Sequence, residues 1–146
     1  MNSFRLAVII CSKGRSDVLA ETLASLSRQK YRPDQIILSV TGTEDLPDDL
    51  SSEIKIISGE PGLTRQLNRA VDSLDSSVEW VLFLDDDVEL DEDYLQAAIE
   101  CLRQRNNLVG LNGLVLHDAE ISRQVARESL LSYSKSPKTW ECQRLY

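Results

Sequence analysis

Short apolar runs recur along most of the chain, and polar turns separate them. The runs are rich in Val, Ile and Leu and alternate little with polar residues, which is typical of strands buried on both faces of a parallel sheet. This pattern predicts strands over residues 4–11, 35–40, 54–57, 80–84 and 108–116.

Amphipathic segments lie between these runs. Leu19, Leu23 and Leu26 follow the first run at helical spacing, so they share one face of a predicted helix. Asp17 can cap this helix, and Thr64 can cap another. Comparable patterns predict helices over residues 17–29, from 64 to about 74, from 91 or 92 to about 105, and over 120–131.

The alternation of strands and helices predicts an α/β fold with an open, doubly wound, mostly parallel sheet in three layers. A length of 146 residues suits one domain, which we expect over residues 1–131. Residues 132–146 have little periodicity and predict a C-terminal tail. Ligands bind such sheets at the carboxyl ends of the strands, where segments 12–15, 59–62 and 85–87 fall.

Composition and charge exclude several classes of protein. The chain is 42% hydrophobic and 27% charged, as in ordinary globular proteins. A net charge of −8 without a concentrated basic face argues against a nucleic-acid partner. No apolar run approaches the roughly 20 residues that span a bilayer, and the N-terminus lacks a signal-peptide cleavage site, so we expect a cytoplasmic protein without a transmembrane segment. The three cysteines have neither zinc-site nor disulfide-framework spacing.

The most unusual feature is the acidic segment at residues 85–93, where seven of nine side chains are carboxylates. Asp85, Asp86 and Asp87 directly follow an apolar run, and carboxylates this close repel one another unless a cation lies beside them. Mg²⁺ or Mn²⁺ held by one or two carboxylates commonly shares its other coordination positions with phosphates. The segment therefore indicates a metal-bridged phosphate ester, with a solvated acidic loop as the alternative.

Two other acidic motifs can be compared with this segment. An EF-hand loop starting at Asp85 would need Gly and Glu where Leu90 and Gln96 stand, so it is excluded. A phosphatase of the haloacid-dehalogenase type also places Asp-x-Asp after an apolar strand. Glu89 occupies the position of its usual Thr or Val, and this phosphatase stays a minor alternative.

Four motifs together, in this order, resemble the family 2 glycosyltransferases with the GT-A fold. They are the Val-Ile-Ile strand at 8–10, the Leu-rich helix at 19–29, the Gly-Leu-Thr-Arg-Gln-Leu-Asn segment at 62–68 and Phe-Leu-Asp-Asp-Asp at 83–87. The resemblance covers about residues 5–117. It implies a nucleotide-sugar-binding domain that uses Mg²⁺ or Mn²⁺. It further implies transfer of a sugar from a UDP-, GDP- or dTDP-sugar to a sugar or lipid-linked acceptor, in polysaccharide or glycoconjugate synthesis.

The resemblance also implies roles for individual residues. Asp87, with Asp85, would bind the metal on the donor diphosphate. Contacts to the nucleotide and its sugar would come from residues in the turn after the first strand, the 62–68 segment and the acidic segment: Ser12, Arg15, Gly62, Arg65, Asn68, Asp85 and Asp86.

The chain departs from the family pattern in three places. Val40-Thr41-Gly42 stands where a paired Asp usually contacts the base, and Leu67 replaces a usual Arg, for which Arg65 is a candidate substitute. The family's acceptor half and catalytic base lie well beyond Asp-x-Asp, so we expect an incomplete domain, with Asp118 as the candidate base. A catalytically inactive domain that binds nucleotide or nothing is the alternative, and peripheral association with a membrane stays open.

Overall fold

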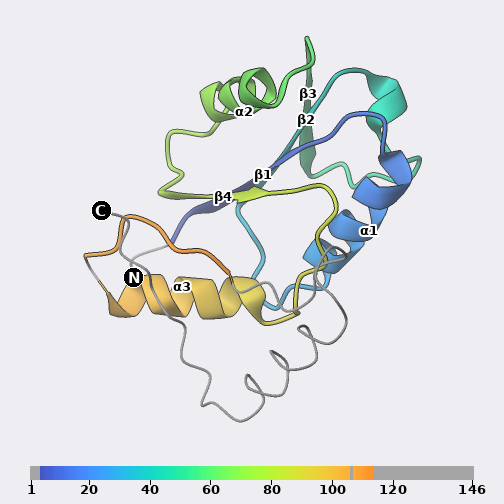
Figure 1. Cartoon of the computed structure of the whole chain (residues 1–146). Helices are drawn as coiled ribbons and strands as arrows, with labels where there is room; N and C mark the ends of the chain where they lie inside the picture. The colour runs from blue at the N-terminus through green and yellow to red at the C-terminus, as the bar shows by residue number, and fades with distance from the viewer. Residues whose placement is uncertain (1–3, 106, 114–146) are drawn as a thin grey trace, which may run out of the picture. The chain divides into compact units, whose positions relative to one another are not determined.

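The computed structural model describes residues 4–105 and 107–113 of the chain (Figure 1). The elements follow the order β1, α1, β2, a 3-10 turn η1, β3, α2, β4 and α3. Their bounds are Leu6–Cys11 for β1, Ser16–Ser27 for α1, Gln35–Val40 for β2, Thr43–Asp45 for η1, Ile54–Ser58 for β3, Leu63–Asp72 for α2, Trp80–Leu84 for β4 and Tyr94–Gln104 for α3. The predicted strands at 35–40 and 80–84 are confirmed at both ends.

The strands form one parallel sheet in the order β3-β2-β1-β4. In its centre, Ile9 of β1 lies opposite Ile37 of β2 and Phe83 of β4. Parallel strands need long crossover connections; α1 provides the one from β1 to β2, and α2 the one from β3 to β4. The third connection, from β2 to β3, contains only η1. The fold-class prediction of an open parallel α/β sheet is therefore confirmed.

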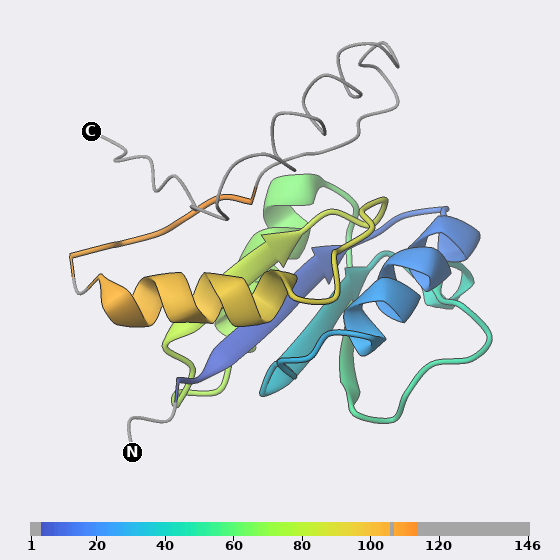
Figure 2. The same cartoon turned by 90° about the horizontal axis from the view of Figure 1, so that it is seen from below.

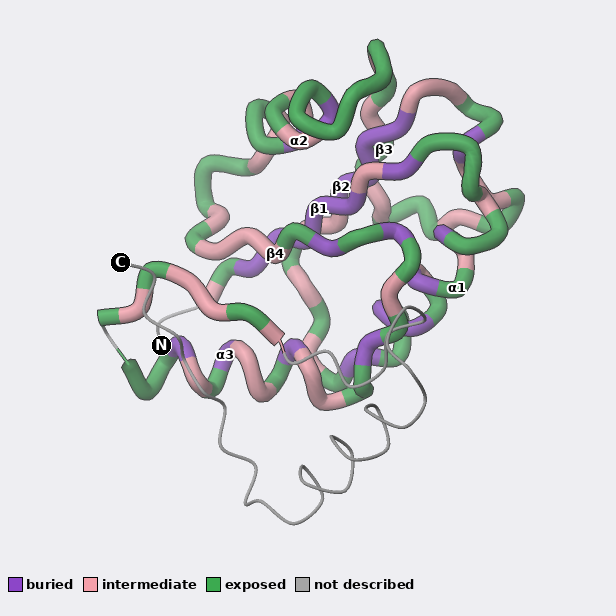
Figure 3. Tube along the Cα trace, viewed as in Figure 1, coloured by how far each residue is buried: buried purple, intermediate pink, exposed green. Residues whose placement is uncertain are grey.

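Helices α1 and α2 lie on opposite faces of the sheet (Figure 2). On the α2 face, Ala70 packs with Ile9 and Ile37, and all three are fully buried. On the other face α1 buries Leu19 and Leu26, two of the three leucines predicted to face the core. Residues 6–10 of β1 are buried throughout, as its unbroken apolar sequence predicts (Figure 3).

The connections place a topological switch point between β1 and β4. From β1 the chain proceeds through β2 to β3 on one side, and it then returns through α2 to β4 on the other side. The carboxyl ends of β1 and β4 therefore lie side by side at the switch point, the usual ligand position in this class of fold. Residues 12–15 and 85–87 belong to these two loops.

Several predicted boundaries differ from the structure. Helix α2 begins at Leu63 after Gly62, whose φ of 129° only glycine adopts readily, so Thr64 is not the cap. Helix α3 begins at Tyr94 rather than at 91 or 92. Residues 108–113, the described part of the predicted fifth strand, form no strand. Gly110, Asn112 and Gly113 fall in this stretch, and these residue types weaken a strand.

The remaining predictions for the C-terminal part lie outside the described residues. These are the end of the fifth strand, the helix over 120–131, the domain boundary at 131 and the tail over 132–146. The chain divides into two compact units, Met1–Gln96 and Ala97–Tyr146, and the whole sheet belongs to the first. Within residues 4–105 and 107–113, no helix has the length and apolar character needed to cross a membrane.

We predict that the core of the sheet is sensitive to truncation at Ile37 and tolerant at Ile56. Ile37→Ala should lower the free energy of unfolding by about 2–5 kcal/mol, because it opens a cavity in a fully buried site. Ile56, on the neighbouring strand, is 43% exposed, so Ile56→Ala should cost less than about 1 kcal/mol. Urea denaturation of the full chain measures both, and equal losses would contradict this account of the core.

Candidate functional site

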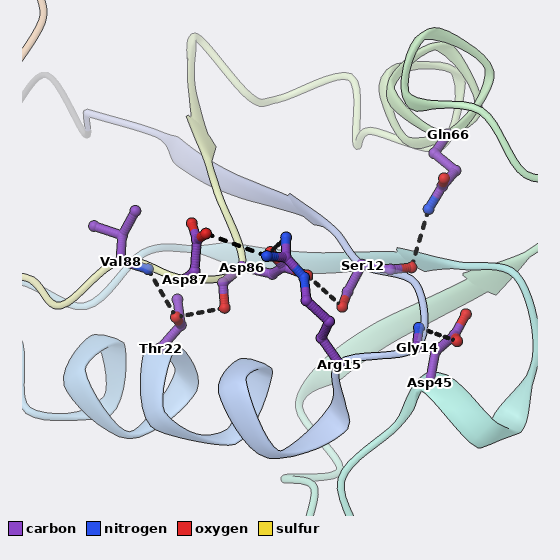
Figure 4. Close-up of polar contacts among 9 residues, drawn as sticks. All are labelled: Ser12, Gly14, Arg15, Thr22, Asp45, Gln66, Asp86, Asp87 and Val88. Atoms are coloured by element: carbon purple, nitrogen blue, oxygen red, sulfur yellow. Dashed lines mark hydrogen bonds and ion pairs between the residues drawn. The ribbon is translucent and has the colours of Figure 1, made fainter. Parts of the chain in front are cut away.

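The carboxylate of Asp86 lies at the centre of the candidate site (Figure 4). Asp86 is only 2% exposed, directly beyond the end of β4. Ser12 Oγ, from the loop after β1, donates a hydrogen bond of 2.6 Å to Asp86 Oδ2. Arg15 Nη2 forms an ion pair with Asp86 Oδ1, and Arg15 Nη1 lies 3.2 Å from Asp87 Oδ2. The structure thus brings Ser12 and Arg15 together with the acidic segment, 71 or more residues apart in sequence.

Hydroxyl groups on α1 hold the backbone of the acidic segment. Thr22 Oγ1 donates to the Asp86 carbonyl oxygen at 2.8 Å and accepts from the Val88 amide at 3.1 Å. Ser25 Oγ accepts from the Leu90 amide at 3.2 Å. Thr22 and Ser25 are both buried, and their positions on the inner face of α1 explain why polar residues interrupt its apolar pattern. The loop after β4 is therefore anchored before any ligand arrives.

Asp85 and Asp87 remain exposed on either side of Asp86. Asp85 lines a small cavity of about 90 Å³ together with Cys11, Phe83 and Leu63. The side chain of Asp87 is 52% exposed even though it is paired with Arg15.

The charges and donor atoms of this cluster fit a divalent cation bound together with phosphate. Three carboxylates and one guanidinium carry −3 + 1 = −2, which one divalent cation would neutralise. Among the described residues, no group of three or more His, Cys, Asp or Glu side chains could hold a metal by itself. Mg²⁺ commonly binds through one or two carboxylates and completes its shell with water and phosphate oxygens. Asp85 and Asp87 are the exposed carboxylates of the cluster, so they are the ones available for that mode of binding.

Of the residues predicted on the α2 side, Gly62 and Arg65 lie at its N-terminus and Asn68 lies near its middle. Gly62 directly precedes α2, and Arg65 in its first turn pairs with Glu60 at 2.8 Å. Arg65 and Asn68 are both exposed. Their predicted contacts with a nucleotide, like those of Ser12 and Asp86, stay predictions. Asp118, the candidate catalytic base, lies outside the described residues.

Sequence reasoning missed the buried carboxylate of Asp45. Its Oδ1 accepts from the Gly14 amide at 2.6 Å, and its Oδ2 accepts from the amide and hydroxyl of Thr41 at 2.7 and 2.6 Å. Burial acts to raise the pKa of Asp45, but the hydrogen bonds from Thr41, Gly14 and Gly42 outweigh it and lower the pKa below its usual 3.8. Asp45 thus fixes the loop after β1 to the loop after β2. The polar segment around it gave no signal that this carboxylate is buried.

Gln66 performs a similar function from α2. It is buried, and its Nε2 donates to Ser12 O at 3.1 Å and to Ser39 O at 2.8 Å (Figure 4 shows the first bond). These contacts tie the helix to the carboxyl ends of β1 and β2. The signal in the sequence is Gln66 itself, a polar residue one turn before the buried Ala70.

The parallel sheet with its switch point between β1 and β4 is that of an α/β protein of the GT-A type, and comparison with known proteins identifies the family. The chain belongs to the glycosyl transferase family 2, which its sequence matches over residues 7–138. This match supports the resemblance found in the motifs and gives no support to a phosphatase. A search of the curated proteins found no match.

Solved structures share the fold at low sequence identity. Staphylococcus aureus TarS, residues 1–349, has a TM-score of 0.56 and 18% identity, and the match covers 82% of this chain and 40% of that one. Its complex with UDP gives a TM-score of 0.55 with the same identity and coverage. Rv0371c from Mycobacterium tuberculosis H37Rv has a TM-score of 0.52 and 16% identity, with 68% and 61% of the two chains covered. The chain therefore spans less than two thirds of the length of each of these proteins.

We predict that Asp86 stabilises the fold and that Asp87 does not. Asp86→Ala should lower the free energy of unfolding by about 1–3 kcal/mol, because the buried Ser12 hydroxyl loses its acceptor. Asp87→Ala removes an exposed carboxylate and should change the free energy by no more than about 0.5 kcal/mol. Chemical denaturation of the two variants checks this, and a neutral Asp86→Ala would refute the central role of Asp86.

We predict that Asp45 makes stability depend on acid pH. The pKa of Asp45 is lower in the folded chain than in the unfolded chain, so the unfolded chain binds more protons. The resulting stabilisation of the fold is complete above the unfolded pKa near 3.8, and it is lost as the pH falls through the folded pKa. Asp45→Asn should therefore be less stable than the starting chain at pH 6, and the two should converge toward pH 2. Urea denaturation across this range measures the difference. Asp49→Asn, which removes an exposed carboxylate of the same loop, is the control and should not converge in this way.

Proposed function

We propose that the chain binds a nucleoside diphosphate sugar at the carboxyl ends of β1 and β4 and transfers the sugar to an acceptor hydroxyl. The observation that carries this proposal is the pairing of Arg15 with Asp86 and Asp87 at the switch point of the sheet. This pairing places the exposed carboxylate of Asp87 beside a guanidinium, with the exposed Asp85 in the same segment, at the position where such folds bind ligands. Membership of glycosyl transferase family 2 supports the reaction class.

Asp87, with Asp85, would hold Mg²⁺ or Mn²⁺ against the donor diphosphate. A bound divalent cation supplies electrostatic stabilisation of the negative charge that develops on a departing diphosphate. Arg15 is placed to orient Asp87 through its Nη1 contact. TarS has been solved with UDP and with UDP-GlcNAc, and these complexes support a nucleotide-sugar donor for the present chain.

The remaining predicted contacts belong to the same proposal. We assign the remaining nucleotide contacts to two elements. These are the loop after β1, with Ser12 and Arg15, and α2 with the residue before it, through Gly62, Arg65 and Asn68. The acceptor would be a sugar or lipid-linked molecule, in the synthesis of polysaccharide or glycoconjugates. Transfer with inversion needs a general base within hydrogen-bond reach of the acceptor hydroxyl, and Asp118 is our candidate.

Calorimetric titration with UDP, in the presence and absence of Mn²⁺, tests the donor site. We expect binding that strengthens when Mn²⁺ is present, because the metal joins two carboxylates to the diphosphate. GDP and dTDP as competitors report how strictly the base is selected. If a folded chain binds none of the three nucleotides with Mn²⁺ present, the proposed donor site is wrong.

Asp87→Ala is expected to reduce UDP affinity with Mn²⁺ to the level measured without the metal, because it removes a carboxylate that we assign to the cation. Glu89→Ala is the matched control, since it deletes one negative charge from the same loop at a side chain 84% exposed. Glu89→Ala should keep the full effect of Mn²⁺. Equal losses in both variants would indicate a general electrostatic effect and contradict metal binding at Asp87.

A further inference from the structure

The hydroxyl group of Thr22 binds the two peptide units on either side of Asp87. Thr22 Oγ1 donates a hydrogen bond of 2.8 Å to the Asp86 carbonyl oxygen, which belongs to the peptide unit that precedes Asp87. It accepts a hydrogen bond of 3.1 Å from the Val88 amide, which belongs to the peptide unit that follows Asp87. One side chain of α1 therefore holds the backbone on both sides of Asp87 (Figure 4).

These two hydrogen bonds restrict the backbone angles of Asp87. Peptide units are planar, so each residue has only two soft backbone dihedral angles, φ toward the preceding unit and ψ toward the following one. Because Thr22 binds both units, neither angle of Asp87 can change far without breaking one of the hydrogen bonds. The direction in which the Asp87 side chain leaves the backbone is fixed as a result.

Asp87 depends on this restraint because its side chain is not held by packing. That side chain is 52% exposed, and the side chain of Arg15, which contacts Asp87 Oδ2 at 3.2 Å, is exposed to the same extent. Exposed ion pairs contribute little energy, so this contact restrains Asp87 only weakly. Thr22 is 1% exposed, and a β-branched side chain has few rotamers in a helix. Thr22 is therefore the rigid partner of the two.

The Thr22 hydroxyl is used differently from that of its neighbour Ser25. In a helix, Ser and Thr hydroxyls commonly donate to a carbonyl oxygen one turn earlier. Ser25 Oγ does so, to Thr22 O at 2.9 Å, whereas Thr22 donates to the acidic segment. Ser25 also binds the acidic segment, but as an acceptor from the Leu90 amide, three residues beyond Asp87. Of these two hydroxyls, only that of Thr22 binds the peptide units of Asp87.

We propose that Thr22 is a positioning residue for the metal site, acting through the backbone of Asp87. The proposal rests on the proposed function, in which Asp87 and Asp85 hold Mg²⁺ or Mn²⁺ against the donor diphosphate. Mg²⁺ requires nearly ideal octahedral geometry with ligands at about 2.0–2.1 Å, so displacement of a carboxylate weakens its binding. Residues that orient metal ligands typically contribute about 10–100-fold to metal affinity. Thr22 is buried and bound to Asp86 and Val88, so it supports a ligand and is not one itself.

Three variants of the full chain separate positioning from a purely structural contribution. Thr22→Val keeps the shape of the side chain and removes the hydroxyl, and Thr22→Ser keeps the hydroxyl. Ser25→Ala is the matched control, because it removes another hydroxyl of α1 that is also 1% exposed. Circular dichroism establishes that each variant is folded at the temperature of the titrations.

The measured quantity is the Mn²⁺ effect, defined as the ratio of the UDP dissociation constants without and with Mn²⁺. Because the ratio is taken within each variant, a general loss of stability changes both constants alike and leaves the ratio unchanged. We expect Thr22→Val to lower the Mn²⁺ effect by about 10-fold, or to a ratio of one where the starting effect is smaller. Thr22→Ser should keep most of the effect. Ser25→Ala should keep all of it, because it releases the Leu90 amide and not the peptide units of Asp87.

Urea denaturation supplies the second readout. Thr22→Val and Ser25→Ala should both lower the denaturation midpoint, since each leaves a backbone amide without its acceptor. A loss of stability in both variants, with a loss of the Mn²⁺ effect in Thr22→Val alone, distinguishes positioning from a structural role.

Three results would overturn the proposal. If Thr22→Val keeps the full Mn²⁺ effect, Thr22 serves the fold alone. If Ser25→Ala loses as much of the effect as Thr22→Val, any loosening of the acidic segment is sufficient and Thr22 has no special role. If the starting chain binds UDP equally with and without Mn²⁺, the metal assignment in the proposed function is itself wrong, and this failure is seen before any variant is compared.

Discussion

The buried carboxylate of Asp86 is the constraint on which the rest of the site depends. A carboxylate removed from water is costly unless hydrogen bonds and an opposite charge compensate it. Ser12 and Arg15 supply both, so the loop after β1 must lie against the loop after β4. Asp86 points inward, whereas Asp85 and Asp87, its neighbours in sequence, stay exposed. One interaction thereby holds the two loops together and presents the carboxylates to which we assign the metal.

The same principle extends to the other loops at this edge of the sheet. Asp45 binds Gly14 and Thr41, and Gln66 binds the backbone at Ser12 and Ser39, so the ends of β1 and β2 are linked to each other and to α2. Each linking group is buried and accepts or donates several hydrogen bonds. Such satisfied buried networks favour a single arrangement, because any alternative leaves polar atoms without partners. The edge is therefore organised without a ligand.

The sheet could be predicted from sequence because its strands are continuous apolar runs that need burial on both faces, as β1 shows most clearly. In parallel sheets, ligands bind at the carboxyl ends of the strands. This rule predicted that Ser12, Arg15 and Asp85–Asp87 lie at one edge of the sheet. The role of Asp45 could not be predicted, because its contacts depend on how two loops meet rather than on local pattern. The prediction of a fifth strand was wrong over residues 108–113. It gave more weight to the apolar residues there than to two glycines and an asparagine, which weaken a strand.

Two arginines give the edge an uneven distribution of charge. Arg15 is paired with two carboxylates and leaves the β4 end negative, whereas Arg69 has no paired carboxylate among the described residues and leaves the β2 end positive. A diphosphate at the proposed donor site would carry the same sign of charge as Asp85 and Asp87, so it would be repelled without a cation. The charge distribution is therefore the physical reason why we assign a divalent cation to the β4 end of the proposed site.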